Sequence, residues 1–211
     1  MLALILALAA SARAIEIHPH PIVTEKRLEL TRRYCKRHYG LDSSRLEAPQ
    51  VVVVHATEMR TLKASLTAFE PDTLSPSRAE IAGHGEVNVG AHFLVDQDGT
   101  VYSLLPLDVI GRHAIGLNHV SIGIENVGSE ADLTPEQAKS DAELIEDLVK
   151  RLPSLRYLIG HHEYARKDLP HHALFKELDR TYPPTKKSDP GKGFMSRLRA
   201  ALAASGVRLA D

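Results

Sequence analysis

The chain has 211 residues, of which 43% are hydrophobic and 25% are charged, a composition typical of one soluble globular domain with a sizeable core. Its 26 lysine and arginine residues balance 27 aspartate and glutamate residues, so the formal net charge of −1 gives no basis for binding nucleic acid or an anionic membrane surface. Cys35 is the only cysteine, which excludes an intramolecular disulfide. The 12 histidines stand out, because clustered histidine is typical of metal or proton chemistry.

The first 14 residues have the form of a secretory signal peptide. An apolar run covers residues 1–10, and Ala12, Arg13 and Ala14 form an A-x-A cleavage site. The run is shorter than the roughly 20 apolar residues of a transmembrane helix, although no basic residue precedes it. We therefore expect cleavage after residue 14 and a periplasmic or secreted protein without a membrane span. An apolar helix that frays, or an early start codon, is the alternative.

Residues 15–47 are expected to form an arm and a helix ahead of the main domain. Two prolines favour an extended arm over 15–22. A helix is predicted over 24–39, because Thr24 can cap its start and Gly40 is placed to end it.

The main domain opens with four consecutive valines, Val51–Val54, which predict a strand buried on both faces. His55 follows at the C-terminal end of this strand. A short helix is predicted over 62–69. Residues 71–88 are rich in Pro, Ser and Gly and predict a long surface loop of the kind that often takes part in binding.

Two further strands, 91–95 and 100–105, are joined by turn residues and predict a β-hairpin. The next strand, 120–127, carries Glu125 near its end. A carboxylate in a core strand is costly unless it is paired or used. Glu125 is therefore a candidate functional residue, with a structural carboxylate as the alternative.

A helix over 134–152 has a clear start, with Thr134 as N-cap, a proline at the first helical position and Gln137 at the third. The remaining predicted elements are a strand over 156–160, a helix around 173–179 and a C-terminal helix over 193–204. Strands that alternate with helices predict an α/β fold, here a single domain over residues 48–205 with a central mixed β-sheet flanked by helices.

Three stretches far apart in the chain contain side chains that suit one zinc ion. His55 and His161 each follow a predicted strand, and Asp189 lies in a Lys-Ser-Asp-Pro-Gly sequence. Two imidazoles and one carboxylate form a donor set that suits Zn²⁺ and leaves the fourth position open. The sequence therefore predicts a catalytic zinc site at the strand ends. His162 is an alternative to His161, and an ordinary turn is the alternative for Asp189.

Five short motifs occur in a specific order over roughly residues 48–200: 53–57, 91–102, 121–125, 160–163 and 187–191. Together they resemble the zinc-dependent N-acetylmuramoyl-L-alanine amidases of the amidase-2 family, which are related to phage-lysozyme-type amidases and peptidoglycan recognition proteins. The resemblance implies cleavage of the amide between the lactyl group of N-acetylmuramic acid and L-alanine. We therefore expect hydrolysis of peptidoglycan or muropeptides in cell-wall turnover or recycling.

The resemblance also implies roles for individual residues. It makes His55, His161 and Asp189 the zinc ligands. It makes Glu125 the general acid/base and Lys187 the cation that supports the oxyanion.

Two further residues are expected to line the substrate groove. The resemblance implies that His113 and Asn118 bind substrate there, and a packed imidazole is the alternative for His113. Many relatives have a catalytic tyrosine at the position of Ala91, whereas relatives with alanine tend to use the glutamate that Glu125 matches. The insertion at about 166–186 separates the second and third ligands more widely than in the family, and we expect it to form one wall of the groove.

The sequence is also compatible with two other functions. One is a non-catalytic peptidoglycan-binding module, which typically lacks a zinc ligand, whereas this chain keeps all three candidates. The other is a zinc peptidase acting on a different amide, although the chain has no His-Glu-x-x-His motif. We expect the protein to be a monomer.

Overall fold

The computed structural model describes residues 15–211, whose centre is a six-stranded mixed sheet with the order β1-β4-β3-β5-β2-β6. Four neighbouring strands are parallel: β3 (Phe93–Val95), β5 (Ser121–Asn126), β2 (Val51–Ala56) and β6 (Tyr157–Gly160). Strand β4 (Val101–Ser103) is antiparallel to β3, which confirms the predicted hairpin. Strand β1 (Ile17–Pro19) pairs with β4, so the expected extended arm supplies an edge strand of the sheet.

Strand β2 lies inside the sheet, and all six of its residues are buried, as the valine run predicts. Side chains alternate between the two faces of a strand. Val52 and Val54 belong to the apolar cluster that includes the buried residues of α4 and α5, whereas Val51 and Val53 belong to a separate cluster. His55 therefore shares the second face with Val51 and Val53.

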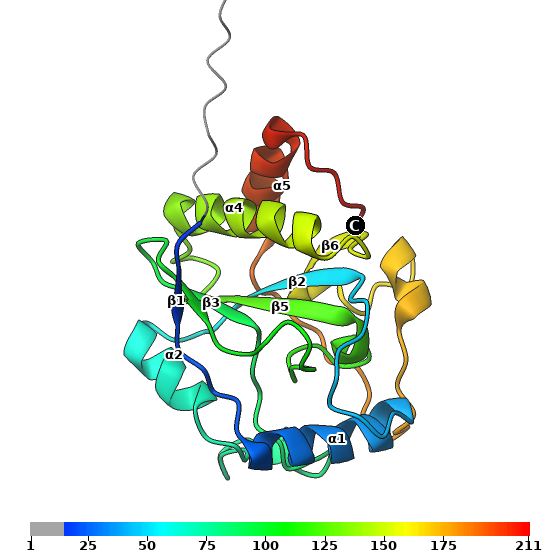
Figure 1. The fold of residues 1–211 in the computed structure, drawn as a ribbon. Coiled ribbons are helices and arrows are strands. Elements are labelled where there is room, and N and C mark those ends of the chain that lie inside the picture. Colours follow the sequence, from blue (N-terminus) through cyan, green and yellow to red (C-terminus); the bar gives the residue numbers. More distant parts are fainter. Residues whose placement is uncertain (1–14) are drawn as a thin grey trace, which may run out of the picture.

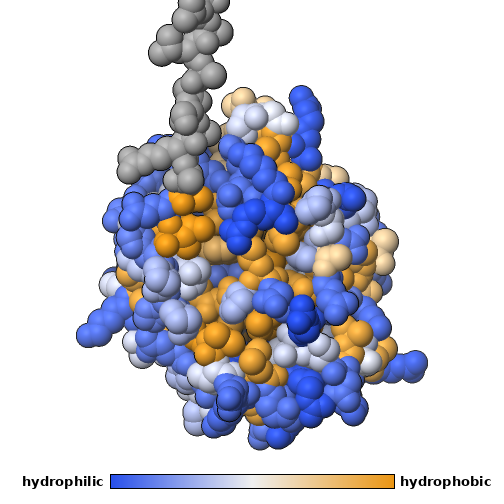
Figure 2. Space-filling view, viewed as in Figure 1, coloured by the Kyte–Doolittle hydropathy of each residue, from blue (hydrophilic) through white to orange (hydrophobic). Residues whose placement is uncertain are grey.

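Helices cover both faces of the sheet (Figure 1). Helices α4 (Pro135–Arg151) and α5 (Lys192–Ser205) pack on each other over one face. Helix α1 (Glu25–Tyr39) lies on the opposite side, and α2 (Leu62–Phe69) packs beside the β1 end. The predicted long loop over 71–88 contains a short helix, α3 (Ala79–Ala82). Figure 2 shows hydrophilic side chains over α1 and α4, with hydrophobic ones between these layers.

The predicted helix boundaries are set by capping contacts. Thr24 caps α1 by accepting a hydrogen bond from the Arg27 N–H, and Gly40 ends the helix with a positive φ of 67°. Thr134 and Gln137 form a reciprocal capping box at the start of α4. These contacts explain why both helices start where the sequence predicts.

The predicted helix around residues 173–179 is wrong. The structure has a 3₁₀ helix over Pro170–Leu174, and the chain is extended beyond it. The N–H groups of Lys176 and Leu178 donate to the carbonyls of Gly116 and His38, so they are not available for helical hydrogen bonds. Two other short 3₁₀ helices are Asn118–Val120 and His161–Glu163.

The expected signal peptide, residues 1–14, lies outside the described residues. Within residues 15–211, no helix is both long enough and apolar enough to cross a bilayer.

Candidate active site

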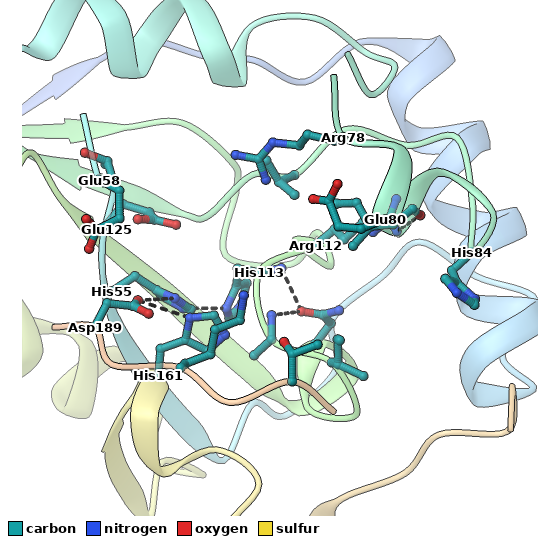
Figure 3. Close-up of a pocket in the computed structure, with 18 of the residues that line it drawn as sticks. His55, Glu58, Arg78, Glu80, His84, Arg112, His113, Glu125, His161 and Asp189 are labelled. Carbon is teal, nitrogen blue, oxygen red and sulfur yellow. Dashed lines mark hydrogen bonds and ion pairs between the residues drawn. The ribbon is translucent and has the colours of Figure 1, made fainter. Parts of the chain in front are cut away.

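Two candidate functional side chains lie next to each other at the ends of adjacent strands. The register of β2 and β5 pairs His55 with Glu125. Paired residues on neighbouring strands point to the same face of the sheet, and Figure 3 shows both side chains facing one cavity. The hydrogen-bonded strands therefore place an imidazole and a carboxylate side by side.

The metal ligands predicted from the sequence are brought together in space. His161 begins the 3₁₀ helix after β6, and Asp189 arrives from a distant loop. One donor atom from each of His55, His161 and Asp189 lies within 4.8 Å of the others. Asp189 Oδ2 is 3.1 Å from Nδ1 of His161 and 3.7 Å from Nδ1 of His55. The three side chains thus form a compact cluster of the size that one metal ion requires (Figure 3).

His162 has a different place from His161. Its backbone N–H donates to the Asp189 carbonyl at 2.9 Å, and its Nδ1 lies 3.1 Å from the same oxygen. The side chain of His162 therefore holds the backbone of Asp189, whereas His161 faces the Asp189 carboxylate.

The protonation states of the cluster suit metal binding. Burial alone would raise the pKa of Asp189, but hydrogen bonds from His161 and His55 hold that pKa well below its usual range. Burial, together with the neighbouring His55, lowers the pKa of His161 to about 4. Near neutral pH the carboxyl is ionised and His161 is neutral, which are the forms that coordinate a cation.

His113 contacts His55, one of the three residues of the ligand cluster (His55, His161 and Asp189). Its Nδ1 lies 3.0 Å from Nε2 of His55, and its Nε2 lies 3.3 Å from the Ser121 hydroxyl. A Cβ at Gly123 would approach the His113 ring to 2.9 Å, so only glycine leaves room for the imidazole there. Burial, and then the neighbouring His55, holds the pKa of His113 well below its ordinary value.

Asn118 is buried beneath the cavity, and its side-chain amide is fully hydrogen-bonded within the protein. Its Oδ1 accepts from the N–H groups of His113 and Ala114, at 2.8 Å and 2.7 Å. Its Nδ2 donates to the hydroxyls of Tyr34 and Tyr39, at 3.3 Å and 3.0 Å. Asn118 thus fixes the backbone that carries His113.

A cavity of about 630 Å³ extends from the ligand cluster, and both Glu125 and Lys187 line it. Burial, opposed mainly by the charge of His55, raises the pKa of Glu125 to about 6. Lys187 is exposed on the opposite loop. The cavity therefore holds a carboxyl that changes protonation near neutral pH, together with a cation and a metal-type ligand set.

Several cavity residues were not identified from the sequence. Arg78 comes from the loop over 71–88, which was expected to take part in binding, and Tyr182 comes from the insertion at about 166–186. Glu58 also lines the cavity and adopts a positive φ of 57°, a strained conformation for a residue with a side chain. Backbone strain of this kind leaves no signal in the sequence.

The chain is similar in sequence to several curated proteins and shares its fold with a solved structure. The endolysin of Escherichia phage T7 is 37% identical over 93 residues, which are 41% of this chain and 61% of the endolysin. Human Peptidoglycan recognition protein 3 is 28% identical over 152 residues, 65% of this chain and 41% of that protein. The match thus spans less than two thirds of either relative. The crystal structure of an AmpD derivative has a TM-score of 0.58 and 22% identity, covering 90% of this chain and 97% of AmpD, and so shows the same fold.

A family model gives the broadest match. The model described as N-acetylmuramoyl-L-alanine amidase matches residues 45–192, which is more than half of the chain. This range contains the two histidines of the ligand cluster, its aspartate and the neighbouring glutamate. The chain therefore belongs to the N-acetylmuramoyl-L-alanine amidase family.

Proposed function

We propose that the protein is a zinc-dependent amidase that hydrolyses the bond between N-acetylmuramic acid and L-alanine in peptidoglycan or muropeptides. The observation that carries this proposal is the convergence of His55, His161 and Asp189 beside Glu125 in one cavity. Family membership and the endolysin relative support the same substrate class.

His55, His161 and Asp189 would hold the zinc ion. Their donor types and their mutual distances fit a site that binds the metal through three protein groups. A bound zinc ion supplies a Lewis acid that polarises a carbonyl and makes water nucleophilic near neutral pH. The ionised Asp189 also offsets the positive charge of the cation, which lowers the cost of burying it.

Glu125 is proposed as the general acid/base. With a pKa raised to about 6, this carboxyl is mostly ionised at neutral pH and can accept a proton from the attacking water. The protonated carboxyl can then give that proton to the leaving amine of L-alanine. Proton transfer by a positioned group contributes on the order of 10²–10⁴ in rate.

Lys187 is proposed to stabilise the negative charge that develops on the carbonyl oxygen. It lines the same cavity and lies two positions before Asp189. A fixed donor aimed at a developing oxyanion contributes roughly 2.7–4 kcal/mol in other hydrolases. The mobility of an exposed lysine places the expected contribution at the lower end of that range.

His113 and Asn118 line the cavity, and we propose that they shape the groove floor on which substrate lies. If Nδ1 of His55 faces the metal, its Nε2–H donates to Nδ1 of His113, and Nε2–H of His113 donates to Ser121. This arrangement fixes the tautomer of His55, as partners of metal-bound histidines commonly do. His113 thereby also acts as a positioning residue.

Export to the periplasm or the cell exterior is proposed because the substrate class is extracytoplasmic and residues 1–14 have the form of a signal peptide. We further propose residues 48–205 as the catalytic domain, with 15–47 preceding it, and a monomeric state.

The decisive experiment measures release of L-alanyl peptide from a purified muropeptide by the zinc-loaded protein. We expect release to be abolished by a chelator and by His55→Ala, and the zinc content to fall in Asp189→Ala. Binding of muropeptide without release would favour the recognition-protein function. Release from the stem peptide alone would favour a peptidase.

A further inference from the structure

Residues 183–188 carry Lys187, the proposed oxyanion-stabilising cation, and belong to no helix or strand. All six residues are exposed, yet Lys187 lines the cavity. Burial is the main influence on the pKa values of Glu125 and His161, and the charge of Lys187 lowers both values by a smaller amount. Lys187 therefore lies close to the proposed reaction centre. A cation stabilises an oxyanion well only if its position is fixed, and an exposed segment without regular structure does not fix it alone.

One buried tyrosine holds this segment. Tyr164 is 1% exposed and directly follows the 3₁₀ helix His161–Glu163. Its hydroxyl donates to the Thr185 carbonyl at 2.9 Å and accepts from the Thr185 N–H at 2.7 Å. Within residues 15–211, residues 183–188 form no other hydrogen bond or ion pair with the rest of the protein. The contact lies two positions before Lys187, so it restrains the backbone that carries the cation.

The ring of Tyr164 is itself fixed by packing. It belongs to the apolar cluster that contains Val51, Val53 and Ile159. It also lies beside the His161 imidazole, with ring centroids 5.0 Å apart and an interplanar angle of 50°. Tyr164 thus connects the Thr185 backbone to strands β2 and β6, at whose ends the two proposed histidine ligands lie.

The third proposed ligand, Asp189, has contacts of its own. Its carbonyl accepts a hydrogen bond from the His162 N–H at 2.9 Å, and its Oδ2 lies 3.1 Å from Nδ1 of His161. Loss of the contact between Tyr164 and Thr185 should therefore loosen residues 183–187 and leave Asp189 in place. The position of the cation and the position of the ligand can be perturbed separately.

We propose that Tyr164 is a positioning residue, whose hydrogen bonds to the Thr185 backbone keep the Lys187 ammonium in the cavity. This inference rests on the proposed amidase function, in which Lys187 stabilises the developing oxyanion. When the segment is released, the cation is in place in a smaller fraction of molecules. The net effect of one hydrogen bond on an equilibrium is about twofold to tenfold. Loss of both should therefore lower kcat by roughly 3–30-fold.

Tyr164→Phe tests the proposal because it removes only the hydroxyl and keeps the ring beside His161. On a purified muropeptide, kcat should fall roughly 3–30-fold, whereas KM and the zinc affinity in a chelator competition should stay within about twofold of wild type. Tyr157→Phe makes the same change on β6, at a residue that forms no hydrogen bond with residues 183–188, and should keep the wild-type kcat. Zinc affinity that falls together with kcat would place the effect at His161 and overturn the inference.

A double-mutant cycle tests whether Tyr164 acts through Lys187. Lys187→Ala should lower kcat by roughly 100-fold. Adding Tyr164→Phe to Lys187→Ala should lower kcat no further, because the group that the hydroxyl positions is gone. A double variant that loses the full additional factor would overturn the inference. Full activity of Lys187→Ala would refute the role of Lys187, and with it the inference, while leaving the amidase function intact. An inactive wild type would refute the amidase function itself.

Trypsin, which cleaves after lysine, gives a readout that does not depend on activity. Cleavage of the native protein after Lys186 and Lys187, identified by fragment masses, should be faster in Tyr164→Phe than in wild type, because the released segment opens more often. Equal rates would overturn the inference. Should Tyr164→Phe fail to fold, Thr185→Gly loosens the same backbone without changing the buried ring. That variant should also lower kcat and speed cleavage, and wild-type values for both would overturn the inference.

Discussion

Asp141 is a buried carboxyl whose ionisation should make the stability of the protein depend on pH. It lies on α4 with 0% exposure, and its Oδ2 accepts a hydrogen bond from Nδ2 of Asn126 at 3.0 Å. The same amide lies 3.3 Å from the His55 carbonyl, so Asp141 supports the strand end that carries a proposed ligand. Among the described residues 15–211, no group forms a hydrogen bond with Asp141 Oδ1. Burial raises the pKa of Asp141 from 3.8 to about 7.

The cost of this burial follows from the two pKa values. A raised pKa in the folded state means that the native protein binds more protons than the unfolded chain between about pH 4 and pH 7, so stability falls as the pH rises. At about 1.36 kcal/mol per pKa unit, the full cost above pH 7 is roughly 4 kcal/mol. Near pH 5 only about 1–2 kcal/mol of this cost is present, because the folded carboxyl still holds its proton.

Asp141→Asn removes the titration and keeps a group that can accept the hydrogen bond from Asn126. Urea unfolding of metal-free protein at pH 5 and pH 8 gives the free energy of unfolding of variant and wild type. The free energy of unfolding of the variant minus that of wild type should be roughly 2–3 kcal/mol larger at pH 8 than at pH 5. The new amide N–H group changes the free energy of unfolding by the same amount at both pH values, so it does not affect this comparison. An equal difference at pH 5 and pH 8 would refute the reasoning.

Three further predictions concern the site and the fold. Glu125→Gln should lower kcat/KM by roughly 10²–10⁴ without loss of bound zinc. Wild-type kcat/KM should fall as the pH drops through about 6, where Glu125 gains its proton, and the variant should not show this fall. Gly123→Ala would push against the His113 ring and should weaken zinc binding roughly 10–100-fold in a chelator competition, and unchanged affinity would contradict the positioning role. Thr134→Ala should lower the free energy of unfolding by about 1 kcal/mol, whereas Thr134→Ser should not.

Features that depend on local sequence were predictable. The four valines of β2 favour a strand that is buried between two other strands, as the structure has it. The capping box at Thr134 sets the start of α4 through contacts between residues three positions apart. The proposed ligands His55 and His161 could be found because each lies at the end of a recognisable strand. Their convergence on Asp189 was inferred from donor chemistry and family resemblance, and the structure brings the three together.

Features that depend on distant partners were not predictable. The predicted helix at 173–179 does not form because the backbone there binds two other segments. The contact between His84 and Tyr182 joins residues nearly a hundred positions apart, and neither belongs to a motif. The positive φ of Glu58 likewise depends on the hydrogen bond of its N–H to Gly128 O across the sheet end.

The wide separation of His161 and Asp189 in sequence is compatible with one metal site because the chain between them does not set the position of Asp189. That position is set by His162, whose backbone and ring both contact the Asp189 carbonyl, and by the Ala56 N–H, which lies 3.4 Å from Asp189 Oδ2. Both anchors are neighbours of a proposed ligand, so they move with the site. The intervening segment therefore contributes a wall of the cavity while these contacts hold Asp189, the proposed third ligand, in place.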